Sequence, residues 1–206
     1  MAFDDNVFIN CPFDENYYPI LRPIIFTVVY LGLQPRIALE RIDSGESRIT
    51  KIIELIRESR YGIHDISRIK AEKAGEIFRL NMPFELGIDV GCRNFGTRKQ
   101  KQKRLLILEA ERFRFQAGLS DLSGSDISAH DNRPELAVAA VRNWLANQCR
   151  PGAPGPTRIW DAFADFMAFN YARLMGRGFS SSDIESYPIA ELISSMMEWA
   201  TAQTKP

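Results

Sequence analysis

The feature that most constrains the fold is a repeated alternation of short apolar runs with longer helical patterns. The apolar runs cover residues 6–10, 35–40, 61–66, 105–109 and 127–130. The helical patterns cover residues 17–32, 48–60, 81–95 and 133–148. Because strands that alternate with helices form parallel sheets with helices on both faces, this order predicts a three-layer α/β/α fold with a five-stranded parallel sheet.

A proline- and glycine-rich segment at residues 150–156 ends the alternation. Such a segment is stiff and kinked, so we divide the chain into an α/β domain (1–149) and a linker with a C-terminal helical hairpin (150–206). The predicted hairpin helices cover residues 159–174 and 184–201. The first is too aromatic for a free helix, so we expect the hairpin to pack on the first domain or, in a homo-oligomer, on a second copy of itself.

Composition excludes several classes of protein. The 26 acidic and 26 basic residues balance, which argues against a general nucleic-acid or acidic-membrane binder. The three cysteines are far apart, which fits a reducing cytoplasm and offers no disulfide or metal pattern. The acidic start argues against a signal peptide, and the longest apolar segment, residues 20–33, is too short to span a bilayer. We expect a cytoplasmic protein without a metal or a cofactor.

Two phosphate-binding patterns are missing. No G-x-G-x-x-G follows the first predicted strand, and there is no Walker A lysine, which disfavours a conventional dehydrogenase or P-loop phosphotransferase. The basic run at residues 98–104 can touch phosphates, but no aromatic side chains interleave with it. We therefore expect this run to be a solvated turn.

Glu85 is an unusual carboxylate within the mostly apolar start of the predicted helix over residues 81–95, which Asn81 is expected to cap. An unpaired carboxylate is costly to bury there. Glu85 therefore pairs with an arginine such as Arg79 or Arg93, points to water, or faces a ligand pocket.

Polar side chains gather at the predicted carboxyl ends of the strands, where open parallel sheets bind ligands. They are Asn10, Asp14, Ser44, Glu46, Arg48, His64, Asp65, Ser67, Asn81 and Glu85. We hypothesise that they converge on one site. Individual members also have ordinary interpretations, since His64 can be a satisfied strand-end histidine and Asp65 can cap the following turn.

Three stretches of the chain, taken together, resemble a known superfamily. They are residues 7–13 (VFINCPF), 64–67 (HDIS) and 83–88 (PFELGI). Their layout resembles that of nucleoside 2-deoxyribosyltransferases and their TIR-like relatives, over roughly residues 5–148. In those proteins the first strand ends in a small-polar loop over the base, and a later strand ends in Asp plus a small residue. A helix then begins with a Glu-hydrophobic-Gly motif whose Glu attacks the anomeric carbon.

The resemblance implies roles for the matching residues. Glu85 would be the nucleophile or cation stabiliser, and Asp65 the second catalytic residue, in contact with the ribose hydroxyls or the base. Asn10 and Phe13 would line the base pocket. The remaining substrate-binding candidates, of which the first two would hold a phosphate at a helix start, are Ser44, Arg48, Asp14, His64, Ser67 and Asn81.

The chain also departs from both branches of the superfamily. The transferases usually carry another acidic residue shortly before the nucleophile, where this chain has Arg79 and Asn81. The NAD-cleaving TIR domains tend to have an aromatic-cysteine pair before their Glu, where this chain has residues 82–84 (MPF). The identity of the substrate therefore does not carry over.

The leading hypothesis is an N-glycosidase-type enzyme that cleaves or transfers the base–ribose bond of a nucleotide, a nucleoside or NAD. Breaking this bond creates an oxocarbenium-like centre, which one carboxylate can stabilise or bond to. NAD would be a substrate here and no cofactor is implied, while a TIR-like role in bacterial defence or signalling is an analogy. The alternative is a non-catalytic nucleotide-sensing or self-assembly module of the same fold. A third possibility, drawn from the aromatic hairpin, is a structural interaction protein.

Overall fold

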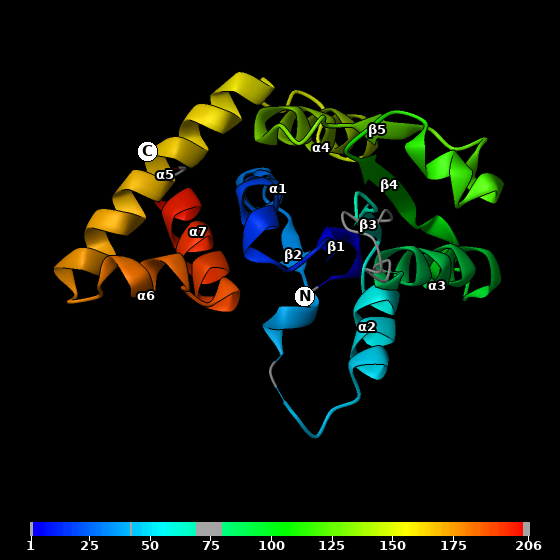
Figure 1. Ribbon diagram of the computed structural model, residues 1–206, viewed down its shortest axis with the longest axis horizontal. Coiled ribbons are helices and arrows are strands. Elements are labelled where there is room, and N and C mark those ends of the chain that lie inside the picture. Colours follow the sequence, from blue (N-terminus) through cyan, green and yellow to red (C-terminus); the bar gives the residue numbers. More distant parts are fainter. Residues whose placement is uncertain (1, 42, 69–79, 204–206) are drawn as a thin grey trace, which may run out of the picture.

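A parallel sheet of five strands runs through the middle of the molecule (Figure 1), in the order β2-β1-β3-β4-β5. The computed structural model describes residues 2–41, 43–68 and 80–203. The strands are β1 (Asn6–Asn10), β2 (Gln34–Arg36), β3 (Tyr61–Asp65), β4 (Arg104–Glu109) and β5 (Ile127–Ala129). This order and the helices on both faces confirm the predicted three-layer α/β/α fold, which is of the flavodoxin-like or Rossmann-like type.

Helices cover both faces of the sheet (Figure 1). They are α1 (Tyr18–Tyr30), α2 (Arg48–Arg57), α3 (Asn81–Phe95) and α4 (Pro134–Gln148). Alternate side chains of a strand point to opposite faces, so Val7 and Ile9 of β1 join the core with α1 and α4, while Phe8 packs with α2. The α1–α4 face and the α2–α3 face therefore have separate cores.

Two predicted boundaries were wrong. The second predicted strand, residues 35–40, is a short β2 followed by a 3₁₀ turn over Ala38–Glu40. The carboxylate of Glu40 closes this turn by accepting hydrogen bonds from the Ile37 backbone N–H and the Arg36 side chain. Asn81 is the first residue inside α3 and not its cap, because Leu80 before it already has a helical backbone conformation.

Lys103 was wrongly predicted to lie in a solvated turn. Its side chain is fully buried, and its amine donates to the carbonyl oxygens of Ile56, at 2.7 Å, and Ser59. The same amine lies 3.2 Å from Oδ1 of Asp89 on α3. Lys103 thus holds the carboxyl-terminal end of α2 against α3, while the other basic residues of the run are exposed.

The C-terminal helices form a hairpin that packs on α1. Packing on the first domain was one of the two arrangements predicted for this hairpin. It consists of α5 (Pro156–Gly176), the short α6 (Ser181–Glu185) and α7 (Ile189–Gln203). The ring of Phe26 on α1 stacks on Phe166 of α5, with centroids 5.6 Å apart, and contacts Trp199 of α7. The second hairpin helix was predicted as one piece, but it breaks ahead of Pro188, because a proline disfavours a helical residue before it.

No helix within the described ranges combines the length and the apolar character needed to cross a membrane.

We expect Gly62→Ala to destabilise the protein by about 1–3 kcal/mol, the usual cost of overpacking. Gly62 lies in β3, and a Cβ there would stand 2.6 Å from Oδ2 of Asp89 and 2.9 Å from Nε2 of His64. Those two atoms contact each other in the buried core, so neither can retreat without breaking their pairing. Urea unfolding measures the effect.

The matched control is Gly87→Ala on α3, where no described atom lies within 4 Å of the added Cβ. Alanine favours a helix over glycine, so this variant should be unchanged or up to about 1 kcal/mol more stable. Equal stability of the two variants would contradict the prediction.

Candidate functional site

The polar residues at the carboxyl edge of the sheet divide into two buried networks, one on each face. His64 and Asp65 are consecutive in β3, so their side chains point to opposite faces. His64 lies on the α2–α3 face beside Asn10 of β1, its neighbour in the parallel register. Asp65 lies on the other face. Strand alternation therefore separates two residues that the sequence places together.

The first group, named here the α3 network, consists of Asn10, His64, Asp89 and Lys103. Nδ2 of Asn10 lies 3.1 Å from Nδ1 of His64, and Nε2 of His64 lies 3.0 Å from Oδ2 of Asp89. Lys103 pairs with the other oxygen of Asp89. All four side chains are buried, so the charges of Asp89 and Lys103 compensate each other away from water.

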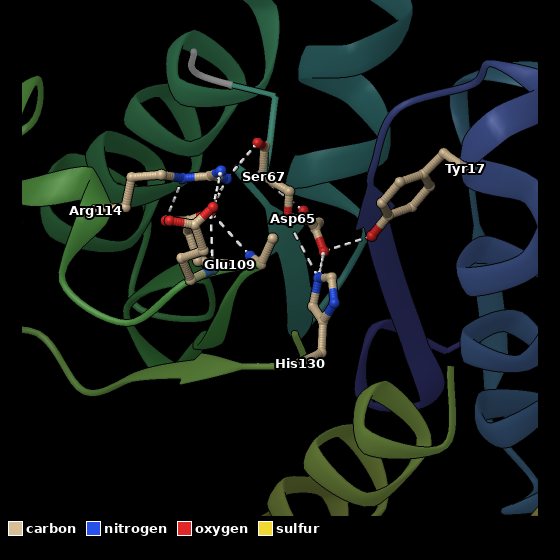
Figure 2. A network of polar contacts seen from close by, with 8 residues as sticks. Tyr17, Asp65, Ser67, Glu109, Arg114 and His130 are labelled. Carbon is tan, nitrogen blue, oxygen red and sulfur yellow. Dashed lines mark hydrogen bonds and ion pairs between the residues drawn. The ribbon is translucent and has the colours of Figure 1, made fainter. Parts of the chain in front are cut away.

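The second group, named here the Asp65 network, consists of Tyr17, Asp65, Ser67 and His130 (Figure 2). Asp65 accepts hydrogen bonds from the Tyr17 hydroxyl and from the Ser67 backbone N–H at 2.8 Å, and its Oδ2 lies 2.8 Å from Nε2 of His130. Burial alone would raise the pKa of Asp65, but the contacts with His130, Ser67 and Tyr17 outweigh it and hold that pKa below its ordinary value. Asp65 is therefore a well-satisfied, ionised carboxylate.

The Asp65 network is not a nucleophile–histidine–carboxylate triad. The hydroxyl of Ser67 lies 3.2 Å from Nε2 of His130, which is the same nitrogen that contacts Asp65. A triad uses both ring nitrogens, one for the nucleophile and one for the carboxylate. Figure 2 also shows Arg114, which pairs with Glu109 and donates to the backbone carbonyl of Ser67 at 2.6 Å. These contacts fix the end of β3 rather than activate a hydroxyl.

Glu85 lies on α3, one turn before Asp89, and only 4% of its surface is exposed. In the described part of the chain its charged partner is Arg48, the first residue of α2, whose Nη2 lies 3.9 Å from Oε1 of Glu85. Arg48 is half-exposed, so this pairing is weak. Burial raises the pKa of Glu85 from 4.5 to about 7, and Arg48 only partly opposes it. A carboxyl group that titrates near neutrality is a typical feature of functional sites.

Cys11 follows β1 and is buried in the core of the α1–α4 face. Burial raises the pKa of its thiol well above the ordinary value, and the charges of Asp65 and then Glu85 add to the effect. The thiol therefore lies within the electrostatic reach of both carboxylates.

The other predicted site residues have varied surroundings. Phe13 is half-buried against the cores of both faces, and Asp14 pairs with Arg68 at 3.5 Å. Glu46 pairs with Arg41 at 2.8 Å. Ser44 and Asn81 are exposed, as is Arg48.

The structure thus brings together Asn10 with His64, Asp65 with Ser67, and Arg48 with Glu85. Arg48 takes the place of Arg93, one of the two predicted partners of Glu85. The other, Arg79, lies outside the described residues, as do all of residues 69–79.

Sequence reasoning missed half of the residues in the two networks. Asp89 follows Glu85 by four positions, which places both on one helix face, and this spacing was an available signal. His130 ends the fifth predicted strand, at the edge where ligands were expected. Lys103 and Tyr17 carried no signal, because nothing in a basic run or in a helix start indicates burial beside a carboxylate.

Comparison of the chain with protein-family models, curated proteins and solved structures finds no match. Within the described ranges, no group of three or more histidine, cysteine or acidic residues is arranged to hold a metal ion. The functional argument therefore depends on the geometry around Glu85.

We expect Glu85→Gln to be more stable than the unchanged protein by about 1–3 kcal/mol near about pH 8, and equally stable below about pH 4. The pKa of Glu85 is higher in the folded chain than in the unfolded chain. The unfolded state therefore loses its proton first, and the unchanged protein loses stability as the pH rises from 4.5 to about 7. Glutamine keeps the shape without the charge, so it escapes this loss.

Urea unfolding across this pH range measures the difference, and carboxyl NMR measures the titration midpoint directly. Arg48→Ala is the companion variant, and it should move the midpoint of Glu85 further upward, because Arg48 favours the ionised form. A midpoint at the ordinary value would refute the assignment.

Proposed function

We propose that this protein is an N-glycosidase-type enzyme that cleaves or transfers the base–ribose bond of a nucleotide, a nucleoside or NAD. The observation that carries the proposal is the buried Glu85 carboxyl, with its pKa raised to about 7, at the start of a helix beside the carboxyl edge of a parallel sheet. The sequence resemblance to nucleoside deoxyribosyltransferases and TIR-like proteins supports the same residue.

Glu85 would act on the positive charge that develops as the bond to the base breaks. The anomeric carbon and ring oxygen become oxocarbenium-like, and an ionised carboxylate can stabilise that cation or bond to it covalently. Little water surrounds Glu85, so its charge is poorly screened and acts strongly on a nearby cation. Arg48 favours the ionised form, which is the form that the reaction needs.

Asp65 has a supporting role in this proposal. Tyr17, Ser67 and His130 already occupy its oxygens, and it is fully buried. We infer that Asp65 fixes the end of β3 as a positioning residue. The proposal also includes substrate contacts by seven further residues, which are Asn10, Phe13, Asp14, Ser44, His64, Ser67 and Asn81. It further includes a cytoplasmic location, a homo-oligomer through the hairpin and a role in defence.

A second candidate is a non-catalytic module that binds a nucleotide without cleaving it. One observation favours it: Asp65, the predicted second catalytic residue, is held ionised by its partners and has no proton to give to a leaving base. Nicotinamide leaves NAD as a neutral base and needs no such proton. The two candidates therefore differ most clearly for substrates whose leaving base must be protonated.

We expect the protein to release base from at least one member of a panel of NAD, nucleoside monophosphates and deoxynucleosides, with Glu85→Gln slower by about 100-fold or more. Chromatography of the free base measures the rate. Glu191→Gln, on an exposed position of α7, is the matched control and should keep the full rate.

The outcomes separate the candidates. Base release that is unaffected by Glu85→Gln would remove the assignment of Glu85. Binding without release, in both the unchanged protein and the variant, would favour the non-catalytic module.

A further inference from the structure

Two buried oxygens of the α3 network accept no hydrogen bond from the described residues: Oδ1 of Asp89, which pairs with the charge of Lys103, and Oδ1 of Asn10. Oδ1 of Asn10 is buried and has no hydrogen-bond partner among the described residues, although Nδ2 of the same amide contacts both His64 and the Met82 carbonyl. A buried acceptor without a donor is destabilising, and native structures rarely keep one without a reason. This oxygen therefore requires an explanation.

The orientation of the Asn10 amide is fixed by its neighbours. Nδ2 lies 2.9 Å from the backbone oxygen of Met82, which can only accept a hydrogen bond. A flipped amide would place two oxygens against each other at that distance. The amide nitrogen must therefore face Met82 and His64, and the oxygen must face away from them.

The rest of the network follows from this orientation. Because Nδ2 of Asn10 can only donate, Nδ1 of His64 must accept, and the ring proton must be on Nε2. Nε2 then donates to Asp89, whose other oxygen pairs with Lys103. Asp89 therefore favours the His64 tautomer with the proton on Nε2. That tautomer in turn supports the orientation of the Asn10 amide.

Asn10 also lies close to the proposed site. Its amide donates to the carbonyl of Met82 in the first turn of α3, three residues before Glu85. The charge of Glu85 contributes to raising the pKa of the next residue, Cys11. Phe13 on the same loop is half-buried and provides an aromatic surface. Asn10 thus joins the end of β1 to the first turn of the helix that carries Glu85.

We propose that Oδ1 of Asn10 accepts a hydrogen bond from an exocyclic amino group of the ligand's base, as on adenine or cytosine, with His64 and Asp89 as positioning residues. This inference rests on the proposed function. An oxo group at the same place on a base would set two acceptors against each other. The oxygen is buried, so the ligand must displace the atoms that now cover it.

Matched nucleotides test the proposal, with Glu85→Gln protein used for binding so that no turnover occurs. Calorimetry compares AMP with IMP, and CMP with UMP, each pair differing in the amino or oxo group of the base. We expect the amino member of at least one pair to bind about tenfold more tightly or better. Asn10→Leu should reduce that ratio to less than about twofold.

Other results would overturn the proposal. Equal binding within both pairs would remove the inference, while base release dependent on Glu85 would leave the proposed function intact. A preference for AMP over 2′-deoxy-AMP without an amino preference would assign the oxygen to a ribose hydroxyl instead. Failure of all four nucleotides to bind would overturn this inference, whereas the proposed function would be overturned only if the whole panel, NAD and deoxynucleosides included, also released no base.

Nitrogen NMR of the unchanged protein tests the network without relying on a variant that folds. The proposal requires His64 to be neutral, with its proton on Nε2. A proton on Nδ1, in either the other tautomer or the charged ring, would point to the opposite amide orientation. That result would overturn the proposal whatever the binding data show.

Discussion

The carboxylate of Asp89 is the contact on which the arrangement of the α2–α3 face depends. A carboxylate in a dry core is costly unless it is paired and hydrogen-bonded, and this one meets both Lys103 and His64. Lys103 donates to a backbone carbonyl at the end of α2, and His64 contacts the amide of Asn10 on β1. Loss of any member would strand a buried charge or polar group. The two helices and the two central strands are therefore tied to one arrangement.

This arrangement gives two carboxylates opposite electrostatic surroundings. Asp65 is surrounded by donors and stays ionised, while Glu85 is buried with only a distant arginine. Environments that push the pKa values of two acids apart are typical of sites where one acid does chemistry and the other holds the structure. This contrast is the reason why we propose Glu85 as the reactive residue and Asp65 as a supporting one.

The C-terminal hairpin stabilises the opposite face. Phe26 of α1 contacts Phe166 and Trp199, so α1 lies between the sheet and the hairpin, and their apolar side chains form one core. Glu85 and the α3 network belong to the other face of the sheet. The aromatic surface that suggested an interaction module in the sequence is thus largely used within the chain.

The sequence by itself determined the alternation of strands and helices, the bounds of β1, and the unusual position of Glu85, because hydrophobic periodicity and a lone charge are local properties. It did not reveal the pairing of Lys103 with Asp89, or of Tyr17 and His130 with Asp65. These partners lie on different elements and come into contact only when the strands and helices pack together. Only the tertiary structure decided which carboxylate is satisfied, since burial and hydrogen bonding depend on neighbours that are distant along the chain.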